Sequence, residues 1–211
     1  MAKASGKFHI EFNPGPQQLA YSIYQKHDVL FLLGPAGTGK TFISTAFAIS
    51  EILQKSKKRI VLTRPIVEAG ESLGYLPGTF EEKVSPYMLP IFDCLQELIP
   101  NEEQRKQVEA TIELAPIAFM RGRSFKNSIC IFDEAQNATK KQLKLFLSRF
   151  STNSKVIITG DPTQSDIGKD SGLMDVVHRL ETVAGVGIIN FGKEHIVRHP
   201  MVAAILDRLE D

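Results

Sequence analysis

Residues 34–41 read Gly-Pro-Ala-Gly-Thr-Gly-Lys-Thr and match the pattern G-x-x-x-x-G-K-[ST], which constrains the fold of this chain more than any other segment. Residues 29–33 before it are all apolar and predict a buried strand. Residues 40–54 after it carry apolar side chains at helical spacing. A loop between a strand and a helix can turn its backbone N–H groups toward one anion, which the helix dipole also faces. The alternative, a glycine-rich turn before a helix, is disfavoured by this context, so the segment predicts a binding loop for phosphates.

Two side chains of this loop add specific chemistry to the backbone. Lys40 is placed to reach the β- and γ-phosphates of a nucleotide, and the Thr41 hydroxyl is placed to ligate Mg²⁺. The guanine-reading pattern N-K-x-D does not occur in the sequence, which favours ATP over GTP. We therefore expect ATP and Mg²⁺ as ligands, with nucleotide contacts from Gly34, Pro35, Ala36, Gly37, Thr38, Gly39, Lys40 and Thr41.

A second apolar run, residues 129–132, ends in the carboxylate pair Asp133 and Glu134. At the end of a buried strand, Asp133 would hold Mg²⁺ through water, together with Thr41. Glu134 would act as the base that polarises the attacking water. The alternative is an acidic helix N-terminus, where Asp and Glu are favoured in any case. The phosphate loop elsewhere in the chain favours the catalytic interpretation, and the pair also favours water over the acceptor substrate of a kinase.

A third expected strand, residues 156–159, is followed by Gly-Asp-Pro-Thr-Gln, which ends at Gln164. A glycine at the end of a strand allows a sharp turn at the sheet edge where open α/β sheets bind ligands. Gln164 could donate to a γ-phosphate oxygen or orient water. The alternative is an ordinary β-turn with proline in a preferred position.

Apolar runs and helical periodicity alternate along the chain, which predicts an α/β fold with a mostly parallel sheet covered on both faces. Residues 65–90 are rich in Gly and Pro and predict mainly loop. The expected strands are residues 29–33, 59–63, 117–120, 128–132, 156–159 and 186–191. The expected helices are residues 17–26, 40–54, 87–109 (two helices interrupted at Pro100), 139–150, 172–182 and 201–209.

Composition excludes several classes of protein. The 211 residues carry a formal net charge of +1, so any nucleic-acid site must be a local patch. The two cysteines lack zinc-site spacing and suit a reducing compartment. No apolar run approaches the length of about 18 residues that a membrane span needs. Since residues 1–7 also lack the apolar core of a signal peptide, we expect a cytoplasmic protein with no membrane contact.

Candidate nucleic-acid contacts are the arginines that follow expected strands, Arg64, Arg121 and Arg123, because arginine holds phosphates bidentately. Structural salt bridges are an equally good interpretation of these three. Tyr75 could stack a base. Lys140, Lys141 and Lys144 add charge, although a solvated helix face is the simpler interpretation of the lysines.

Taken together, these motifs resemble those of superfamily-one helicases and, more closely, the PhoH-like family of ATPases. The matching residues are 34–41, 64–78, 121–123, 133–137, 160–164, 171–173 and 197–199, and the resemblance extends from about residue 17 to the last residue. It implies a single-lobe RecA-like P-loop NTPase over residues 17–211, preceded by a partly disordered segment, residues 1–16. It also implies ATP hydrolysis linked to RNA or single-stranded DNA.

The same resemblance implies further roles for individual residues. Gln17 or Gln18 matches the glutamine that reads adenine, and Arg198 matches an arginine near the γ-phosphate, catalytic together with Lys40, Glu134 and Gln164. We see no second RecA-like lobe, PIN nuclease domain or KH-type extension in these residues, so helicase and ribonuclease activity are less secure than ATP hydrolysis. In many P-loop motors the nucleotide lies between two lobes or two subunits, so a single lobe would need a neighbouring subunit. We therefore expect a homo-oligomer, a hexameric ring, with Arg198 serving its own or an adjacent site. The alternative function is an ATP-gated protein-binding module without motor or nuclease activity.

Overall fold

The computed structural model describes residues 10, 12–65, 80–197, 201 and 208 of the chain. Several predictions lie wholly or largely outside these residues. They are the partly disordered segment at residues 1–16, the C-terminal helix at residues 201–209, Tyr75 and Arg198.

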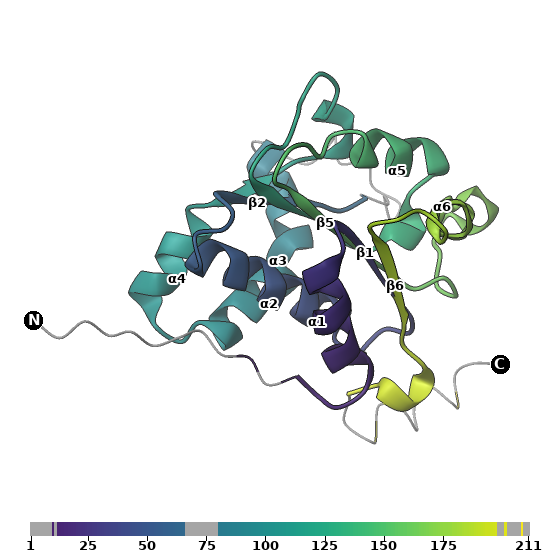
Figure 1. Ribbon diagram of the computed structural model, residues 1–211, viewed down its shortest axis with the longest axis horizontal. Helices are drawn as coiled ribbons and strands as arrows, with labels where there is room; N and C mark the ends of the chain where they lie inside the picture. The colour runs from purple at the N-terminus through teal and green to yellow at the C-terminus, as the bar shows by residue number, and fades with distance from the viewer. Residues whose placement is uncertain (1–9, 11, 66–79, 198–200, 202–207, 209–211) are drawn as a thin grey trace, which may run out of the picture.

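A parallel sheet of six strands forms the centre of the described structure, in the order β3-β2-β4-β5-β1-β6 (Figure 1). Every neighbouring pair of strands is parallel. All residues of β1 and β4 are buried, as expected for strands that are covered on both faces. The strands are β1 (Val29–Leu33), β2 (Arg59–Thr63), β3 (Ile112–Leu114), β4 (Ser128–Phe132), β5 (Lys155–Gly160) and β6 (Val186–Asn190).

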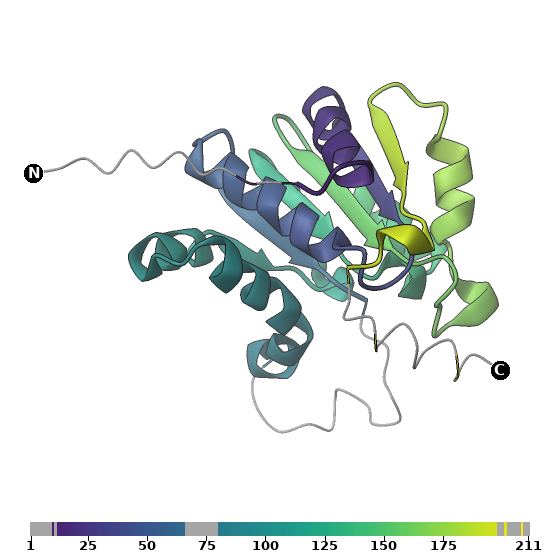
Figure 2. The same cartoon turned by 90° about the horizontal axis from the view of Figure 1, so that it is seen from below.

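Helices cover both faces of this sheet (Figure 2). Alternate residues of β1 show the two sides: Leu30 and Leu32 pack in one core and Phe31 and Leu33 in the other. The first core also contains residues of α1 (Pro16–Lys26), α2 (Lys40–Leu53), α3 (Phe80–Leu98) and α4 (Glu102–Glu109). The second contains residues of α5 (Lys140–Leu147) and α6 (Leu173–Leu180).

The third strand does not lie where the sequence predicted it. Strand β3 is Ile112–Leu114, and the expected strand at residues 117–120 is a 3₁₀ helix, η2 (Ile117–Phe119). Ile112 pairs with Ile60 of β2, and the backbone N–H of Ala115 donates to Leu62 O at 2.8 Å. Pro116 follows and has no N–H to continue the ladder, so the chain leaves the sheet there.

The loop predicted at residues 65–90 was wrong for residues 80–86, because α3 begins at Phe80 and includes Pro86 and Pro90; the helix predicted from residue 87 is confirmed. Proline in a helix interior costs about 3 kcal/mol, so both prolines indicated loop. Met88, Ile91 and Leu95 lie one or two turns apart and are buried in the core that α2 also forms. This tertiary packing outweighs the local preference. The interruption predicted at Pro100 is confirmed, since α3 ends at Leu98 and α4 begins at Glu102.

None of the helices in the described ranges is both long enough and apolar enough to cross a membrane.

Candidate nucleotide and magnesium site

The loop at residues 34–41 joins the carboxyl end of β1 to the first turn of α2. Its backbone needs glycine. A Cβ on Gly34 would lie 2.3 Å from Phe191 O, and Gly37 and Gly39 have φ values of +83° and +84°, which L side chains rarely adopt. The buried Thr38 hydroxyl donates to Pro35 O at 2.9 Å and so holds the loop from inside. The loop therefore has the backbone shape that the sequence pattern predicts.

Lys40 is the first residue of α2, and its side chain folds over the loop. Its Nζ donates to Gly34 O at 2.6 Å and to Pro35 O at 2.7 Å. The ammonium group thus lies beside the backbone that would cradle phosphates.

Asp133 follows β4 directly and lies next to Thr41, although 92 positions separate them in the chain. Its Oδ1 accepts from Thr41 Oγ1 at 3.2 Å and also from the hydroxyl of Thr159 in β5. The aspartate side chain is almost fully buried. The structure therefore brings together the two residues that the sequence predicted as magnesium ligands.

The residues at this point fit a magnesium ion. Asp133 Oδ2 is buried and has no hydrogen-bond partner within the described structure, and such an oxygen normally has one. A Mg²⁺ ion held through water would satisfy this oxygen, and Thr41 supplies a neutral ligand beside it. No cluster of three or more His, Cys, Asp or Glu side chains occurs among the residues described. Mg²⁺ needs none, because it uses one or two carboxylates together with waters and substrate phosphates.

Glu134 has a left-handed backbone, with φ 56° and ψ 45°, which is uncommon outside glycine and often marks functional sites. Its Oε2 accepts from Gln136 Nε2 at 2.5 Å, and its Oε1 lies 3.6 Å from an Arg64 nitrogen. About a third of the side chain is exposed, so solvent water can reach it. The carboxylate is thus held at the border between the core and solvent, as a base for water requires.

Gln136 connects this carboxylate to the loop after β5, a connection that sequence reasoning missed. Its Oε1 accepts from the backbone N–H of Asp161 at 3.0 Å. Asp161 Oδ1 in turn accepts from the backbone N–H and the hydroxyl of Thr163, at 2.9 and 2.7 Å. Gln164 closes the turn through its backbone N–H to Asp161 O at 3.2 Å, and its side chain is exposed. Both Gln136 and Asp161 lie inside the recognised motifs, but only the folded contacts assign them a positioning role.

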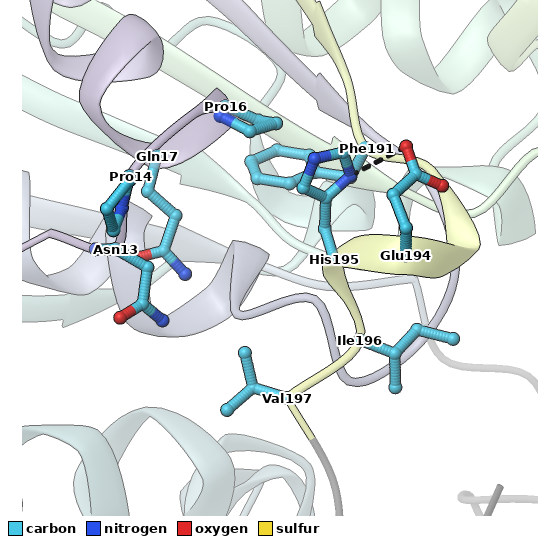
Figure 3. Close-up of a pocket in the computed structure, with 9 residues that line it drawn as sticks. All are labelled: Asn13, Pro14, Pro16, Gln17, Phe191, Glu194, His195, Ile196 and Val197. Atoms are coloured by element: carbon cyan, nitrogen blue, oxygen red, sulfur yellow. Dashed lines mark hydrogen bonds and ion pairs between the residues drawn. The ribbon is translucent and has the colours of Figure 1, made fainter.

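A cavity of about 180 Å³ lies beside the loop (Figure 3). Asn13 and Pro14, which precede α1, and the first turn of α1 form one wall, and the chain after β6 forms the other. Its lining residues are Asn13, Pro14, Pro16, Gln17, Phe191, Glu194, His195, Ile196 and Val197. The volume is below the range of about 300–1,000 Å³ for whole-ligand sites, so the cavity suits one part of a nucleotide, such as its base.

The two glutamines that the sequence left open differ in this structure. Gln17 lines the cavity, and its Nε2 lies 3.2 Å from where a Cβ on Gly39 would be. Its Oε1 accepts from the backbone N–H of Asn13 at 3.0 Å, which fixes the amide. Gln18 is exposed and is not part of the cavity lining. The geometry therefore favours Gln17.

The three arginines predicted as nucleic-acid contacts have different surroundings. Arg64 lies inside the nucleotide site, 3.9 Å from Asp133 Oδ2 and 3.6 Å from Glu134 Oε1. Arg123 forms an ion pair with Glu113 and lies over the Phe125 ring, 5.1 Å from its centroid, so it has a structural role. Arg121 is exposed and lines a separate surface groove.

Known proteins resemble this chain in sequence and in fold. The sequence model of the family described as PhoH-like protein matches residues 9–210. A PhoH-like protein of Synechocystis is 46% identical over 189 residues, which cover 88% of this chain and 58% of the relative. Protein PhoH of Escherichia coli K12 is 44% identical over 179 residues, 82% of this chain and 51% of the relative. The chain thus spans about half the length of these relatives.

Two solved structures share the fold at low identity. The Sulfolobus solfataricus SWI2/SNF2 ATPase core in complex with dsDNA has a TM-score of 0.51 at 13% identity and covers 89% of this chain and 46% of that one. The large terminase from a thermophilic bacteriophage in complex with ADP has a TM-score of 0.53 at 10% identity. The match covers 93% of this chain and 50% of the terminase chain. At these identities the likeness concerns the fold, an α/β P-loop NTPase.

Proposed function

This chain belongs to the PhoH-like protein family, and we propose that it hydrolyses ATP with Mg²⁺ and couples hydrolysis to the binding or remodelling of RNA or single-stranded DNA. The observation that carries the ATPase proposal is the contact of Thr41 with Asp133 beside the glycine loop. This contact joins a phosphate site on β1 to a metal-binding carboxylate on β4. Arg64, Glu134 and Gln136 complete the set of charged and polar groups at the same edge of the sheet.

In the proposed reaction the loop N–H groups and the Lys40 ammonium hold the β- and γ-phosphates. Mg²⁺, bound by Thr41 and through water by Asp133, would neutralise charge on the phosphate oxygens. Glu134 accepts a proton from the water that attacks the γ-phosphorus, and the bond to the β-phosphate oxygen of the leaving ADP breaks. Gln164 orients this water or donates to a γ-phosphate oxygen.

The cavity beside the loop is the proposed adenine site, with Gln17 as the reader. A glutamine amide can pair with the N6 and N7 edge of adenine, accepting through oxygen and donating through nitrogen. Guanine presents an acceptor at the first of these positions and would leave the amide mispaired. The proposed site would therefore prefer ATP to GTP.

Replacing Gln17 by alanine should weaken ATP binding by up to about tenfold, the effect of losing one or two hydrogen bonds to the base. Gln18→Ala is the matched control, because Gln18 is exposed on the same helix turn. Competition between ATP and GTP, measured by calorimetry, should show a smaller preference for ATP in Gln17→Ala and an unchanged one in Gln18→Ala. The opposite pattern would make Gln18 the reader.

Arg198 is the proposed arginine near the γ-phosphate. The described chain supports this as far as Val197, whose backbone N–H donates to Gly37 O at 2.8 Å, so the segment that leads to Arg198 reaches the phosphate loop. We further propose a homo-oligomer, a hexameric ring, in which Arg198 serves its own or an adjacent site. Light scattering that finds a fully active monomer at the working concentration would exclude the ring.

Polynucleotide-stimulated turnover tests the coupling and separates the proposal from its alternative, an ATP-gated protein-binding module. Phosphate release should rise when single-stranded RNA or DNA is added, and no acceptor other than water should be needed. The stimulation should fall with salt, because cationic contacts to phosphates release counterions. Phosphate release that is the same with and without polynucleotide, even at low ionic strength, would favour the protein-binding module.

A further inference from the structure

A groove with a cavity volume of about 470 Å³ lies on the α5 side of the sheet, away from the nucleotide cavity. The 3₁₀ helix η2 and the turn after it form one wall, and α5 forms the other. Three apolar residues line it, Ile117, Ala118 and Leu145, together with three cations, Arg121, Lys141 and Lys144. We call this the basic groove.

The charge of the basic groove is not balanced by the residues around it. None of the side chains that line it is a carboxylate. Within the described part of the chain, no ion pair involves Arg121, Lys141 or Lys144. All three side chains are exposed, and the two lysines lie three residues apart on one helix face, where like charges repel. The groove therefore favours an anionic occupant.

Two neighbouring cations form ion pairs that connect elements of the fold. Lys140, one residue before Lys141, pairs with Asp175 at 2.7 Å, and Arg123, two residues after Arg121, pairs with Glu113. These pairs tie α5 to α6 and the turn after η2 to β3. The three cations of the basic groove have no such partner in the described residues, so a structural role does not account for them.

A strand of nucleic acid fits the basic groove better than an acidic peptide does. Single-stranded polynucleotides bind to grooves that combine cations for the phosphates with apolar or aromatic surfaces for the bases. The apolar floor and the cationic rim provide this combination, and Arg121 can hold a phosphate bidentately. Phe119 follows the lining residues Ile117 and Ala118 on the same 3₁₀ helix and is 61% exposed, just outside the lining itself. An acidic peptide would use the cations but not the apolar floor and the ring.

We propose that the basic groove binds a segment of single-stranded RNA or DNA, with phosphates on Arg121, Lys141 and Lys144 and bases against the apolar floor and Phe119. This proposal rests on the proposed polynucleotide coupling and assigns it a surface. The groove is also connected to the ATPase residues. Helix α5 begins after its N-cap Thr139, and only the 3₁₀ helix η3 (Ala135–Asn137), whose first two residues are buried, and the buried Ala138 lie between Thr139 and Glu134.

The test uses the triple variant Arg121→Gln, Lys141→Gln and Lys144→Gln, with Lys26→Gln and Lys58→Gln as the control. Lys26 and Lys58 are exposed and lie just before β1 and β2, at the opposite edge of the sheet. Fluorescence anisotropy with oligo-uridine and oligo-thymidine, titrated with salt, measures binding. Because each phosphate contact on a single strand contributes about 0.7 to the salt slope, the triple variant should lose about 2 from this slope and at least about tenfold in affinity. The control variant should keep nearly the wild-type salt slope and affinity.

Phe119→Ala provides a second measurement that does not depend on charge. It should weaken binding at every salt concentration and leave the salt slope unchanged, because stacking releases no counterions. Basal phosphate release without polynucleotide should stay at the wild-type level in all three proteins, since none of these residues touches the nucleotide site. Thermal unfolding verifies that each variant is folded.

Other outcomes separate the two proposals. If wild type binds and the triple variant keeps its affinity and slope, the groove proposal is overturned and polynucleotide coupling stands. If wild type hydrolyses ATP but binds neither oligonucleotide at low salt, both proposals fail and the ATPase assignment remains. Groove-dependent binding of poly-glutamate in place of the oligonucleotides would overturn the proposal in favour of an acidic protein partner.

Discussion

Glu134→Gln should bind ATP and Mg²⁺ like the wild type and hydrolyse ATP about 10²–10⁴-fold more slowly, the usual contribution of a general base. The glutamine side chain has nearly the same shape and leaves Asp133 and Thr41 untouched, so the phosphate and metal contacts survive. Its amide cannot take the proton of the attacking water. The contact with Gln136 can also persist, because the new amide keeps one acceptor oxygen. Calorimetry should therefore show normal nucleotide binding while a single-turnover assay shows almost no phosphate release.

Glu103→Gln is a suitable control for this variant, because Glu103 is exposed on the first turn of α4 and has the same chemistry. Its turnover should match the wild type. If Glu134→Gln hydrolyses ATP at the wild-type rate, Glu134 is not the base that takes the proton of the attacking water.

Lys40→Ala should lose both hydrolysis and much of its affinity for ATP. The ammonium group lies over the loop carbonyls of Gly34 and Pro35, beside the backbone that would bind the β- and γ-phosphates. Its charge would stabilise these oxygens in the bound state and more strongly in the transition state. Removing one such electrostatic contact lowers turnover by about 10²–10³-fold. Steady-state kinetics should therefore show a lower kcat and a higher KM together.

Lys106→Ala, a change at an exposed lysine of α4, controls for the loss of a surface charge. Lys40→Ala contrasts with Glu134→Gln, because one variant loses binding and the other keeps it. Normal ATP affinity and normal turnover in Lys40→Ala would contradict the proposed phosphate site, whatever the result for Glu134→Gln.

The main parts of the fold and of the site were predictable because they depend on local patterns. Unbroken apolar runs indicated strands β1, β2, β4 and β5, and the helical spacing after Lys40 indicated α2. Parallel strands place all their carboxyl ends at one edge of the sheet, so motifs that follow β1, β4 and β5 were expected to meet. The contacts of Asp133 with Thr41 and Thr159 confirm this inference.

Some details could not be predicted from the sequence because contacts between distant segments decide them. The apolar stretch at residues 117–119 indicated a strand, but it is Ile112–Leu114 that pairs with β2, and Pro116 then ends the ladder. The prolines in α3 indicated loop, but burial of Met88, Ile91 and Leu95 stabilises a helix there. For Arg64 the sequence left a nucleic-acid contact and a salt bridge equally open, and the structure places this side chain beside Asp133 and Glu134.

The sequence by itself determined the α/β class, the phosphate loop and the carboxylate pair, because each depends on residues that are neighbours in the chain. Only the tertiary structure decided that Gln17 and not Gln18 lines the cavity beside the phosphate loop, that Arg64 lies beside the acidic pair, and that Arg121 shares a groove with Lys141 and Lys144. The physical reason is that these partners are far apart in the chain and close only in the folded protein. A side chain's partners across the fold depend on how helices pack on the sheet, and no spacing along the chain records that packing.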